Sequence, residues 1–495
     1  MKSGLYARVP MFGGATMALL TAMAGSAIAA PTAADLAHIQ AIETGLLPAM
    51  VVKGEASPAM TLPARMAALH VPGVSLAFFE DGKLAWAKAY GLSDVEHNVP
   101  VTTDTLFQAG SISKPLAAMA ALRLVEAGKL SLDEDVNTRL KSWQVPVSPL
   151  SAAQKVTLRR LLTHTAGLTV HGFRGYSRTE ARPTLPQVLN GEKPANSAPV
   201  TVVATPGAAW SYSGGGYTVA QLMMQDVTGR PFADLVRETV LVPAGLAAST
   251  YEQPLPPARE AAAALGYRGD GRIVDGGWHV YPEQAAAGLW TTPSDLARLA
   301  IELQNEAVGT SSRILSPAMA RTMLTGGMGE WGLGVNVPAD GPARFGHGGA
   351  NEGFRNEFVA FTGGHRQGFV VMTNGDNGSE LIAELERAVA AVYGWPIDRP
   401  DEVTPVTVGP AVLARDAGVY EIAGVGRLEV SVKDGRLFVA TPAMGPAPLE
   451  ARTSATGFFI QSAGVVGEFS NGPDGAVTGM ALKSPFGPFA AKKIS

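Results

Sequence analysis

The stretch that decides most about this chain is Phe107-Gln108-Ala109-Gly110-Ser111-Ile112-Ser113-Lys114. An apolar run follows it, and together they predict a helix from Ser111 to about Ala127, ended by Gly128. Residues three apart lie on one face of a helix, so the Lys114 amine is expected beside the Ser111 hydroxyl. A lysine with a lowered pKa can take the hydroxyl proton and make the oxygen a nucleophile. Ser111 and Lys114 are therefore a candidate nucleophile and base.

Composition limits the kinds of protein that this chain can be. With 495 residues, 46% of them hydrophobic, the chain can bury a large core and form more than one domain. The formal net charge is -4 and no basic run occurs, so nothing favours nucleic acid as a partner. The absence of cysteine excludes disulfides, thiolate metal sites and a cysteine nucleophile.

The first residues predict an export signal over 1–29. Lys2 and Arg8 give the positive start, residues 17–24 are apolar, and Ala27-Ile28-Ala29 fits a cleavage site. An uncleaved membrane anchor is the alternative, but the segment is weakly hydrophobic for a span. No later segment is long and apolar enough to cross a membrane. We expect a bacterial protein of the periplasm or the medium, with no membrane span after signal cleavage.

Strand patterns near both ends of the first domain predict an α+β fold. Residues 73–79 and 84–87 predict a hairpin turned at an Asp-Gly dipeptide, and residues 355–361 and 368–373 predict later strands. Helical patterns such as 217–227 lie between them. The expected result is an antiparallel sheet assembled from distant parts of the chain.

The sequence pattern changes after residue 395. Prolines recur across 396–411 and predict a linker between a first domain over 30–395 and a second over 412–495. Residues 428–432 alternate in polarity before an Asp-Gly turn, which is typical of short antiparallel strands. The second domain is therefore predicted to be a small all-β barrel.

Two further segments give the serine possible partners. Tyr212 lies on a glycine-rich stretch before a helix, where a phenolate held by cations can serve as general base. His347-Gly348-Gly349 would let substrate lie close to a strand and place an imidazole at a substrate carboxylate. Taken singly, each segment has a structural explanation, as an aromatic packed on a loop or as a turn.

The three elements, in this order, resemble the serine β-lactamase and penicillin-binding-protein superfamily, in its class C-like, D-peptidase and esterase-like branch. The resemblance runs from about Leu69 to Tyr393, and Leu161 to Leu168 also looks like a structural signature of the family. It implies a β-lactamase/transpeptidase-like domain, in which an antiparallel sheet is flanked by helices and joined to an all-helical region. Within the signature, His164 is expected to support the fold.

The resemblance assigns a role to each motif residue. Ser111 would be the acylated nucleophile and Lys114 its proton acceptor, with Tyr212 sharing the base role in deacylation. Backbone N–H groups of Ser111 and Ala350 would form the oxyanion hole. No cofactor and no metal is implied.

The third motif would bind substrate, and it departs from the family pattern. His347, Gly348 and Gly349 stand where relatives have Lys-Thr-Gly, which removes a permanent positive charge. Arg355 is near enough in sequence to replace that cation. The family's Tyr-x-Asn also reads Tyr212-Ser213-Gly214 here, without the amide. Both departures argue against an efficient β-lactamase, and the His-x-Gly form resembles D-aminopeptidase-like hydrolases.

The second domain resembles the lipocalin-like barrels appended to some of these hydrolases. In such proteins the barrel can shape or cover the active-site mouth, and a stabilising or docking role is the alternative.

The sequence thus predicts an exported serine hydrolase that forms an acyl-enzyme with an ester, an amide or a D-amino-acid-containing peptide. The alternatives are a β-lactamase or D-alanyl-D-alanine carboxypeptidase, a Ser-His arrangement with His347 as base, and a non-catalytic protein that binds peptidoglycan or peptides. The chain has no Gly-x-Ser-x-Gly and no His-Glu-x-x-His. The expected partner is a small-molecule or peptide substrate.

Overall fold

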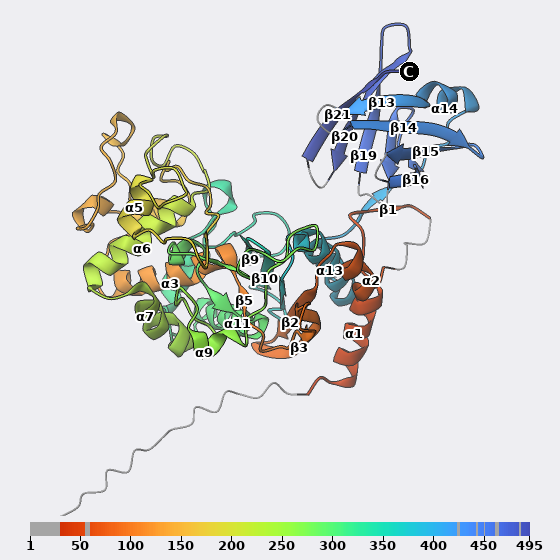
Figure 1. Ribbon diagram of the computed structural model, residues 1–495. Coiled ribbons are helices and arrows are strands. Elements are labelled where there is room, and N and C mark those ends of the chain that lie inside the picture. Colours follow the sequence, from red (N-terminus) through yellow and green to blue (C-terminus); the bar gives the residue numbers. More distant parts are fainter. Residues whose placement is uncertain are drawn as a thin grey trace, which may run out of the picture.

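The computed structural model describes residues 30–54, 60–422, 426–441, 444–449, 451–460, 465–484 and 487–495 (Figure 1). The predicted signal, 1–29, lies outside these residues. Among the helices of the described ranges, none combines the length and the apolar character needed to cross a membrane.

A six-stranded antiparallel sheet forms the centre of the first domain, in the order β4-β3-β2-β11-β10-β9. Its strands are β2 (Gly73–Glu80), β3 (Lys83–Asp94), β4 (Val99–Pro100), β9 (Arg344–Asn351), β10 (Phe354–Phe361) and β11 (Gly368–Thr373). Because β11 pairs with β2, strands almost 300 positions apart in sequence lie side by side. The predicted hairpin and the antiparallel sheet built from distant segments are confirmed.

Helices cover both faces of this sheet and enclose two apolar cores. One face carries α1 (Ala33–Thr44), α2 (Leu62–Ala68) and α13 (Gly378–Tyr393). The other carries α11 (Pro293–Val308) and the helical region. Neighbouring strand residues alternate between the faces, so Phe78 belongs to the first core and Phe79 to the second.

The helical region is formed by the part of the sequence between β4 and β9. Its helices are α3 (Ser113–Glu126), α4 (Leu158–Leu162), α5 (Leu185–Asn190), α6 (Gly214–Thr228), α7 (Phe232–Val236), α8 (Val242–Ala244), α9 (Pro257–Glu260), α10 (Gln284–Ala287) and α12 (Pro317–Met323). Two short strand pairs join it, β5 (Phe107–Gln108) with β8 (Trp290–Thr291) and β6 (Tyr176–Ser177) with β7 (His279–Val280). The mixed α and β architecture predicted from the sequence is confirmed.

Two helix starts differ from the sequence prediction. Ser111 belongs to a single 3-10 turn, Gly110–Ile112, and α3 begins only at Ser113. The glycines after Tyr212 form the first turn of α6 and not a loop, with Ser213 as the cap whose hydroxyl accepts from Gly216 N at 3.0 Å. A short side chain suits this helix start because a Cβ on Gly215 would lie 2.8 Å from the carbonyl oxygen of Thr169.

A nine-stranded antiparallel sheet makes up the C-terminal part and curls into a half-barrel whose edges are β16 and β17. Its strands are β13 (Gly418–Ile422), β14 (Gly426–Lys433), β15 (Arg436–Thr441), β16 (Met444–Pro448), β17 (Ala451–Arg452), β18 (Gly457–Ile460), β19 (Val465–Asn471), β20 (Val477–Ser484) and β21 (Gly487–Lys493). A third apolar core lies inside the curl, below α14 (Pro410–Asp416). The predicted all-β architecture is confirmed, as an open half-barrel.

The segment between the two sheets also forms regular structure. The predicted linker contains β12 (Asp401–Val403), which pairs in parallel with β1 (Met50–Val52).

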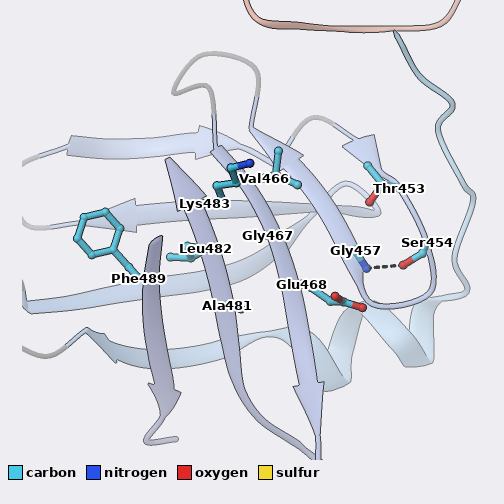
Figure 2. A pocket seen from close by; sticks show the side chains of 10 residues that line it. All are labelled: Thr453, Ser454, Gly457, Val466, Gly467, Glu468, Ala481, Leu482, Lys483 and Phe489. Carbon is cyan, nitrogen blue, oxygen red and sulfur yellow. Dashed lines mark hydrogen bonds between the residues drawn. The ribbon is translucent and has the colours of Figure 1, made fainter. Parts of the chain in front are cut away.

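A cavity of about 540 Å³ lies on β18–β21 (Figure 2). Thr453, Ser454, Gly457, Val466, Gly467, Glu468, Ala481, Leu482, Lys483 and Phe489 line it.

Candidate active site

The site forms where β9 packs against the 3-10 turn that carries Ser111. Glycines permit this close approach, because a Cβ on Gly349 would lie 1.9 Å from the carbonyl oxygen of Ala109. A Cβ on Gly110, whose φ is +55°, would lie 2.5 Å from the backbone nitrogen of Ala350. The sequence-predicted Ser111 and Ala350 are thus brought to the same place. Their N–H groups come from a helix start and from a strand that face each other.

Ser111 and Lys114 lie within hydrogen-bond distance, as the sequence predicts. The Lys114 Nζ is 2.9 Å from the Ser111 Oγ and donates to the carbonyl oxygen of Ala286 in α10 at 2.8 Å. Ser111 is partly exposed, while Lys114 is only 2% exposed. Burial disfavours the charged amine and lowers the pKa of Lys114 to about 7. A substantial part of the lysines is therefore neutral at neutral pH and able to accept a proton.

The Tyr212 ring closes the site on the side of α6. It lies 5.0 Å from the Lys114 Nζ, measured to the ring centroid. Burial raises the pKa of Tyr212 well above its usual value, and a hydrogen bond with the Ser111 side chain opposes that rise. At neutral pH the phenol is therefore protonated. It can pass a proton between neighbours, but it is not the phenolate that the sequence analysis considered.

His164 holds Tyr212 from behind. Its ring stacks on the Tyr212 ring with centroids 4.1 Å apart. The backbone nitrogens on either side of Tyr212 are fixed by the same residue: Ser211 N donates to the His164 carbonyl at 2.8 Å, and Ser213 N donates to its Nδ1 at 3.1 Å. Burial, followed by the charge of Lys114, lowers the pKa of His164 well below its usual value. His164 is therefore neutral and positions the tyrosine.

His347 faces the site from β9 and is 4% exposed. Its Nδ1 lies 2.5 Å from the Gly348 carbonyl oxygen, which can only accept, so Nδ1 carries the hydrogen. Burial, followed by the charge of Lys114, lowers the pKa of His347 to about 3. The ring is thus neutral and its Nε2 is a hydrogen-bond acceptor. That atom is buried and has no partner among the described residues.

A family model described as beta-lactamase matches residues 60–393, more than half of the chain. The chain belongs to the β-lactamase family. Members of this fold family are serine hydrolases, and the chain is accordingly an enzyme of that kind.

Individual relatives agree with the family match. Penicillin-binding protein 4 of Amycolatopsis lactamdurans is 28% identical over 375 residues, which cover 72% of this chain and 94% of the relative. Esterase EstB of Burkholderia gladioli is 31% identical over 171 residues, 33% of this chain and 43% of the esterase. The structure of D-amino acid amidase from Ochrobactrum anthropi superimposes with a TM-score of 0.56 and 22% identity, and covers 72% of this chain and 98% of the amidase.

Arg355 does not join this β-lactamase-family site. It alternates along β10 with Phe354 and Asn356, whose side chains lie on the sheet face that packs against the helical region and the catalytic turn. Its own side chain lies on the face covered by α13, where its Nη2 pairs with Asp376 at 3.0 Å. We therefore propose no substrate contact for Arg355.

A buried amide network, which the sequence analysis missed, supports the β-lactamase-family site from below. Asn351 donates to the Gln108 side chain at 3.0 Å and to the Ala287 carbonyl at 3.1 Å. Asn356 donates to the Gln108 carbonyl at 2.9 Å. These bonds join β9, β10, β5 and α10 around the catalytic turn. Amides inside otherwise apolar strands were the only signal that could have revealed the network.

Trp331 was also missed, because it lies in an irregular segment far from every motif. Its ring meets the His347 ring edge-on with centroids 5.3 Å apart, and the Tyr212 ring at 5.8 Å. Trp210, which is 36% exposed, lies 5.8 Å from Trp331. The β-lactamase-family site therefore has an aromatic wall. Within the described part of the chain, no group of three or more metal-binding side chains occurs.

Proposed function

We propose that this protein is an exported hydrolase that forms an acyl-enzyme on Ser111 and cleaves an ester, an amide or a D-amino-acid-containing peptide. The observation that carries the proposal is the 2.9 Å contact between the Ser111 Oγ and a buried Lys114 that forms no ion pair with a described residue. The esterase and amidase among the similar proteins support this range of substrates. The signal-like segment 1–29 supports export.

The acylation step follows from these positions. Neutral Lys114 takes the Ser111 proton as the Oγ attacks the substrate carbonyl carbon. The backbone N–H groups of Ser111 and Ala350 stabilise the negative charge that develops on the carbonyl oxygen. The tetrahedral intermediate then collapses, and the Lys114 proton passes to the leaving group, through the Tyr212 phenol. Ser111 is left as an ester of the substrate acyl group.

Deacylation reverses the proton path. A water molecule attacks the acyl carbon, and Lys114 with Tyr212 accepts its proton. The intermediate collapses, the carboxylic acid leaves, and the proton returns to the Ser111 Oγ. Both half-reactions use the same base and the same oxyanion hole, so one set of residues serves both steps of the acyl-enzyme mechanism.

The state of His347 restricts the substrate further. A neutral imidazole with hydrogen on Nδ1 offers only a lone pair at Nε2 and cannot attract a carboxylate. We propose that the preferred substrate carries no carboxylate near the scissile bond and presents an N–H or O–H group to this atom. A β-lactam or a peptide ending in D-alanine, each with such a carboxylate, would be a slow substrate.

Covalent labelling tests the nucleophile. A fluorescent fluorophosphonate should label the wild-type protein and the Ser312→Ala control, whose side chain is exposed, but not Ser111→Ala. Steady-state hydrolysis of p-nitrophenyl acetate should fall at least about 1,000-fold in Ser111→Ala. Equal labelling of wild-type and Ser111→Ala protein would disprove the assignment.

A further inference from the structure

The strand that carries Ala350 pairs with the sheet on one side and faces the catalytic turn on the other. β9 is the edge strand of the central sheet, next to β10. On its outer side Gly346 N donates to the Asn336 carbonyl at 3.1 Å, and Asn336 N donates to the Gly346 carbonyl at 2.9 Å. Backbone groups alternate along a strand, so the Ala350 N–H, four residues on, points off the same edge. The hydrogen bonds between β9 and β10 therefore do not set the distance from this N–H group to Ser111.

The side chain of Asn351 connects this edge strand to the segment that holds the catalytic lysine. Its Nδ2 donates to the Ala287 carbonyl at 3.1 Å. Asn351 directly follows Ala350 in β9. Ala287 directly follows Ala286, whose carbonyl oxygen accepts from the Lys114 Nζ at 2.8 Å. One amide thus joins the neighbour of the proposed oxyanion donor to the neighbour of the group that accepts from the lysine.

The acceptor fixes the orientation of the Asn351 amide. A backbone carbonyl can only accept, so the amide nitrogen and not the amide oxygen faces Ala287. The same nitrogen donates at 3.0 Å to the Oε1 of Gln108, which lies in β5 three residues before Ser111. The Asn351 Oδ1 is buried without a hydrogen-bond partner among the described residues. An unpartnered buried oxygen costs stability, and an apolar side chain of the same shape would avoid that cost, so stability alone does not account for an amide here.

Other hydrogen bonds tie the segment after α10 to the catalytic turn and to α3. Ala109 N donates to the Leu289 carbonyl at 2.8 Å, and Leu289 N donates to the Ser113 Oγ at 3.0 Å. These bonds keep the acceptor of the lysine beside the turn that carries the nucleophile. Base and nucleophile are therefore held together from the helical side, and the Asn351 amide adds the position of the strand.

We propose that Asn351 is a positioning residue, which holds the Ala350 N–H at the distance from Ser111 that the oxyanion hole requires. The inference rests on the proposed function and concerns the same site. A donor stabilises the developing oxyanion only when it lies about 2.7–3.1 Å from that oxygen. A misplacement of about 1 Å can slow a reaction about 100-fold. The Asn351 amide acts through Ala350 and touches no reacting atom.

Replacing the carbonyl oxygen of the substrate by sulfur tests the oxyanion hole separately from the base. The esters p-nitrophenyl acetate and p-nitrophenyl thionoacetate have the same leaving group and differ in the atom on which negative charge develops. A hole sized for oxygen should favour the acetate strongly in the wild-type protein. In Asn351→Leu, which keeps the branched shape of the side chain, we expect kcat/KM for the acetate to fall about 30-fold. The ratio of acetate to thionoacetate kcat/KM should fall about tenfold, because a displaced donor serves oxygen less well.

Asn374→Leu is the matched control. The Asn374 Nδ2 also donates to two backbone carbonyls, that of Leu92 at 3.1 Å and that of Leu265 at 3.0 Å. Its Oδ1 is likewise buried without a partner among the described residues. These bonds join β3 to the segment after α9. Asn374→Leu should therefore keep the wild-type ratio, even where it lowers the Tm.

Two further measurements separate a structural role from a positioning role. Asn351→Ser keeps a donor that is too short to reach both acceptors, so the ratio should fall in this milder variant as well. Thermal unfolding of each variant reports whether the protein is folded. The inflection of kcat/KM near pH 7 should stay in place in the Asn351 variants, because the contacts of Lys114 are kept.

The possible results separate this inference from the proposed function. A wild-type ratio in both folded Asn351 variants overturns the positioning role, and so does an equal fall of the ratio in Asn374→Leu. A shifted pH inflection with an unchanged ratio also overturns it, since the amide would then act on Lys114. Each of these results leaves the hydrolase assignment standing as long as Ser111→Ala is inactive. If Ser111→Ala hydrolyses p-nitrophenyl acetate like the wild type, the proposed function fails and the inference with it.

Discussion

The hydrolase domain and the C-terminal half-barrel can be compared through two buried cations, Lys114 in the first and Arg452 in the second. The Lys114 Nζ meets only uncharged oxygens, the Ser111 hydroxyl and the Ala286 carbonyl. The Arg452 Nη1 meets a carboxylate, Asp416 Oδ2, at 2.6 Å. The two side chains are 2% and 7% exposed, so depth alone does not distinguish them.

The difference lies in the partner. A buried cation without a counter-charge loses its proton more readily, which makes an amine a base near neutral pH. A buried cation on a carboxylate keeps its charge and fixes the elements that carry the pair, here β17 and the end of α14. The same physical situation thus yields a reactive group in one domain and a structural joint in the other.

Removing Lys114 should have the largest effect. We expect Lys114→Met to lower kcat/KM for p-nitrophenyl acetate at least about 1,000-fold, because the protonated Tyr212 phenol, which also bonds to Ser111, cannot take over as the base. The same change should raise the free energy of unfolding by about 2 kcal/mol, since a desolvated amine is replaced by an apolar chain. Lys129→Met, at an exposed position after α3, is the control. An active Lys114→Met enzyme would refute Lys114 as base.

Removing Arg452 should lower the stability of the half-barrel and leave the hydrolytic activity unchanged. Arg452→Met leaves Asp416 buried with only the 3.2 Å contact to Arg415, and should destabilise the half-barrel by about 3 kcal/mol. Calorimetry should then show a lower Tm, while hydrolysis stays within about twofold of the wild type. Arg436→Met, an exposed change on β15, should alter neither quantity. Loss of hydrolysis in the folded Arg452→Met protein would show that the two buried cations are coupled.

The pH dependence of activity and stability tests whether the buried Lys114 is a neutral base, and its expected effect is smaller than that of the two substitutions. Because Lys114 acts as the neutral amine, kcat/KM should rise through an inflection near pH 7 and fall about tenfold per unit below it. The unfolded chain binds the lysine proton up to its ordinary pKa, so wild-type stability should also increase from about pH 7 towards pH 10. Lys114→Met should lack that increase. A rate that is flat between pH 6 and 8 would contradict the lowered pKa.

The smallest expected effect concerns the residue behind Tyr212. His164→Phe preserves the ring stack but removes the acceptor for Ser213 N. We expect kcat to fall roughly fivefold with little change in KM, because the phenol is displaced slightly while substrate contacts are kept. The pH inflection should stay near 7, since Lys114 is untouched. A change in KM alone would mean that His164 acts on binding and not on position.

The sequence predicted what depends on spacing along one element. Ser111 and Lys114 are three residues apart, so their contact needs only a local helical turn. The alternation and turns of the C-terminal strands likewise predicted an all-β sheet. The start of α3 was misplaced by two residues because Gly110 adopts a left-handed φ and adds a 3-10 turn.

The parts that escaped depend on distant contacts. Arg355 follows the third motif closely, but strand alternation turns its side chain to the other face. Trp331 reaches His347 only through the fold. The neutral state of His347 comes from burial and from a bond to its own neighbour, neither of which a residue type reveals.

The parallel pair of β1 and β12 has a consequence for how this chain can be cut. Lys53 N donates to the Val403 carbonyl, and Asp401 N donates to the Ala49 carbonyl. These hydrogen bonds join two segments that lie far apart in the sequence. Val52 also packs on Phe459 of the half-barrel. A protein truncated at residue 396 would leave β1 as an open, sticky strand edge. The smallest well-behaved hydrolase fragment should therefore extend past Val403.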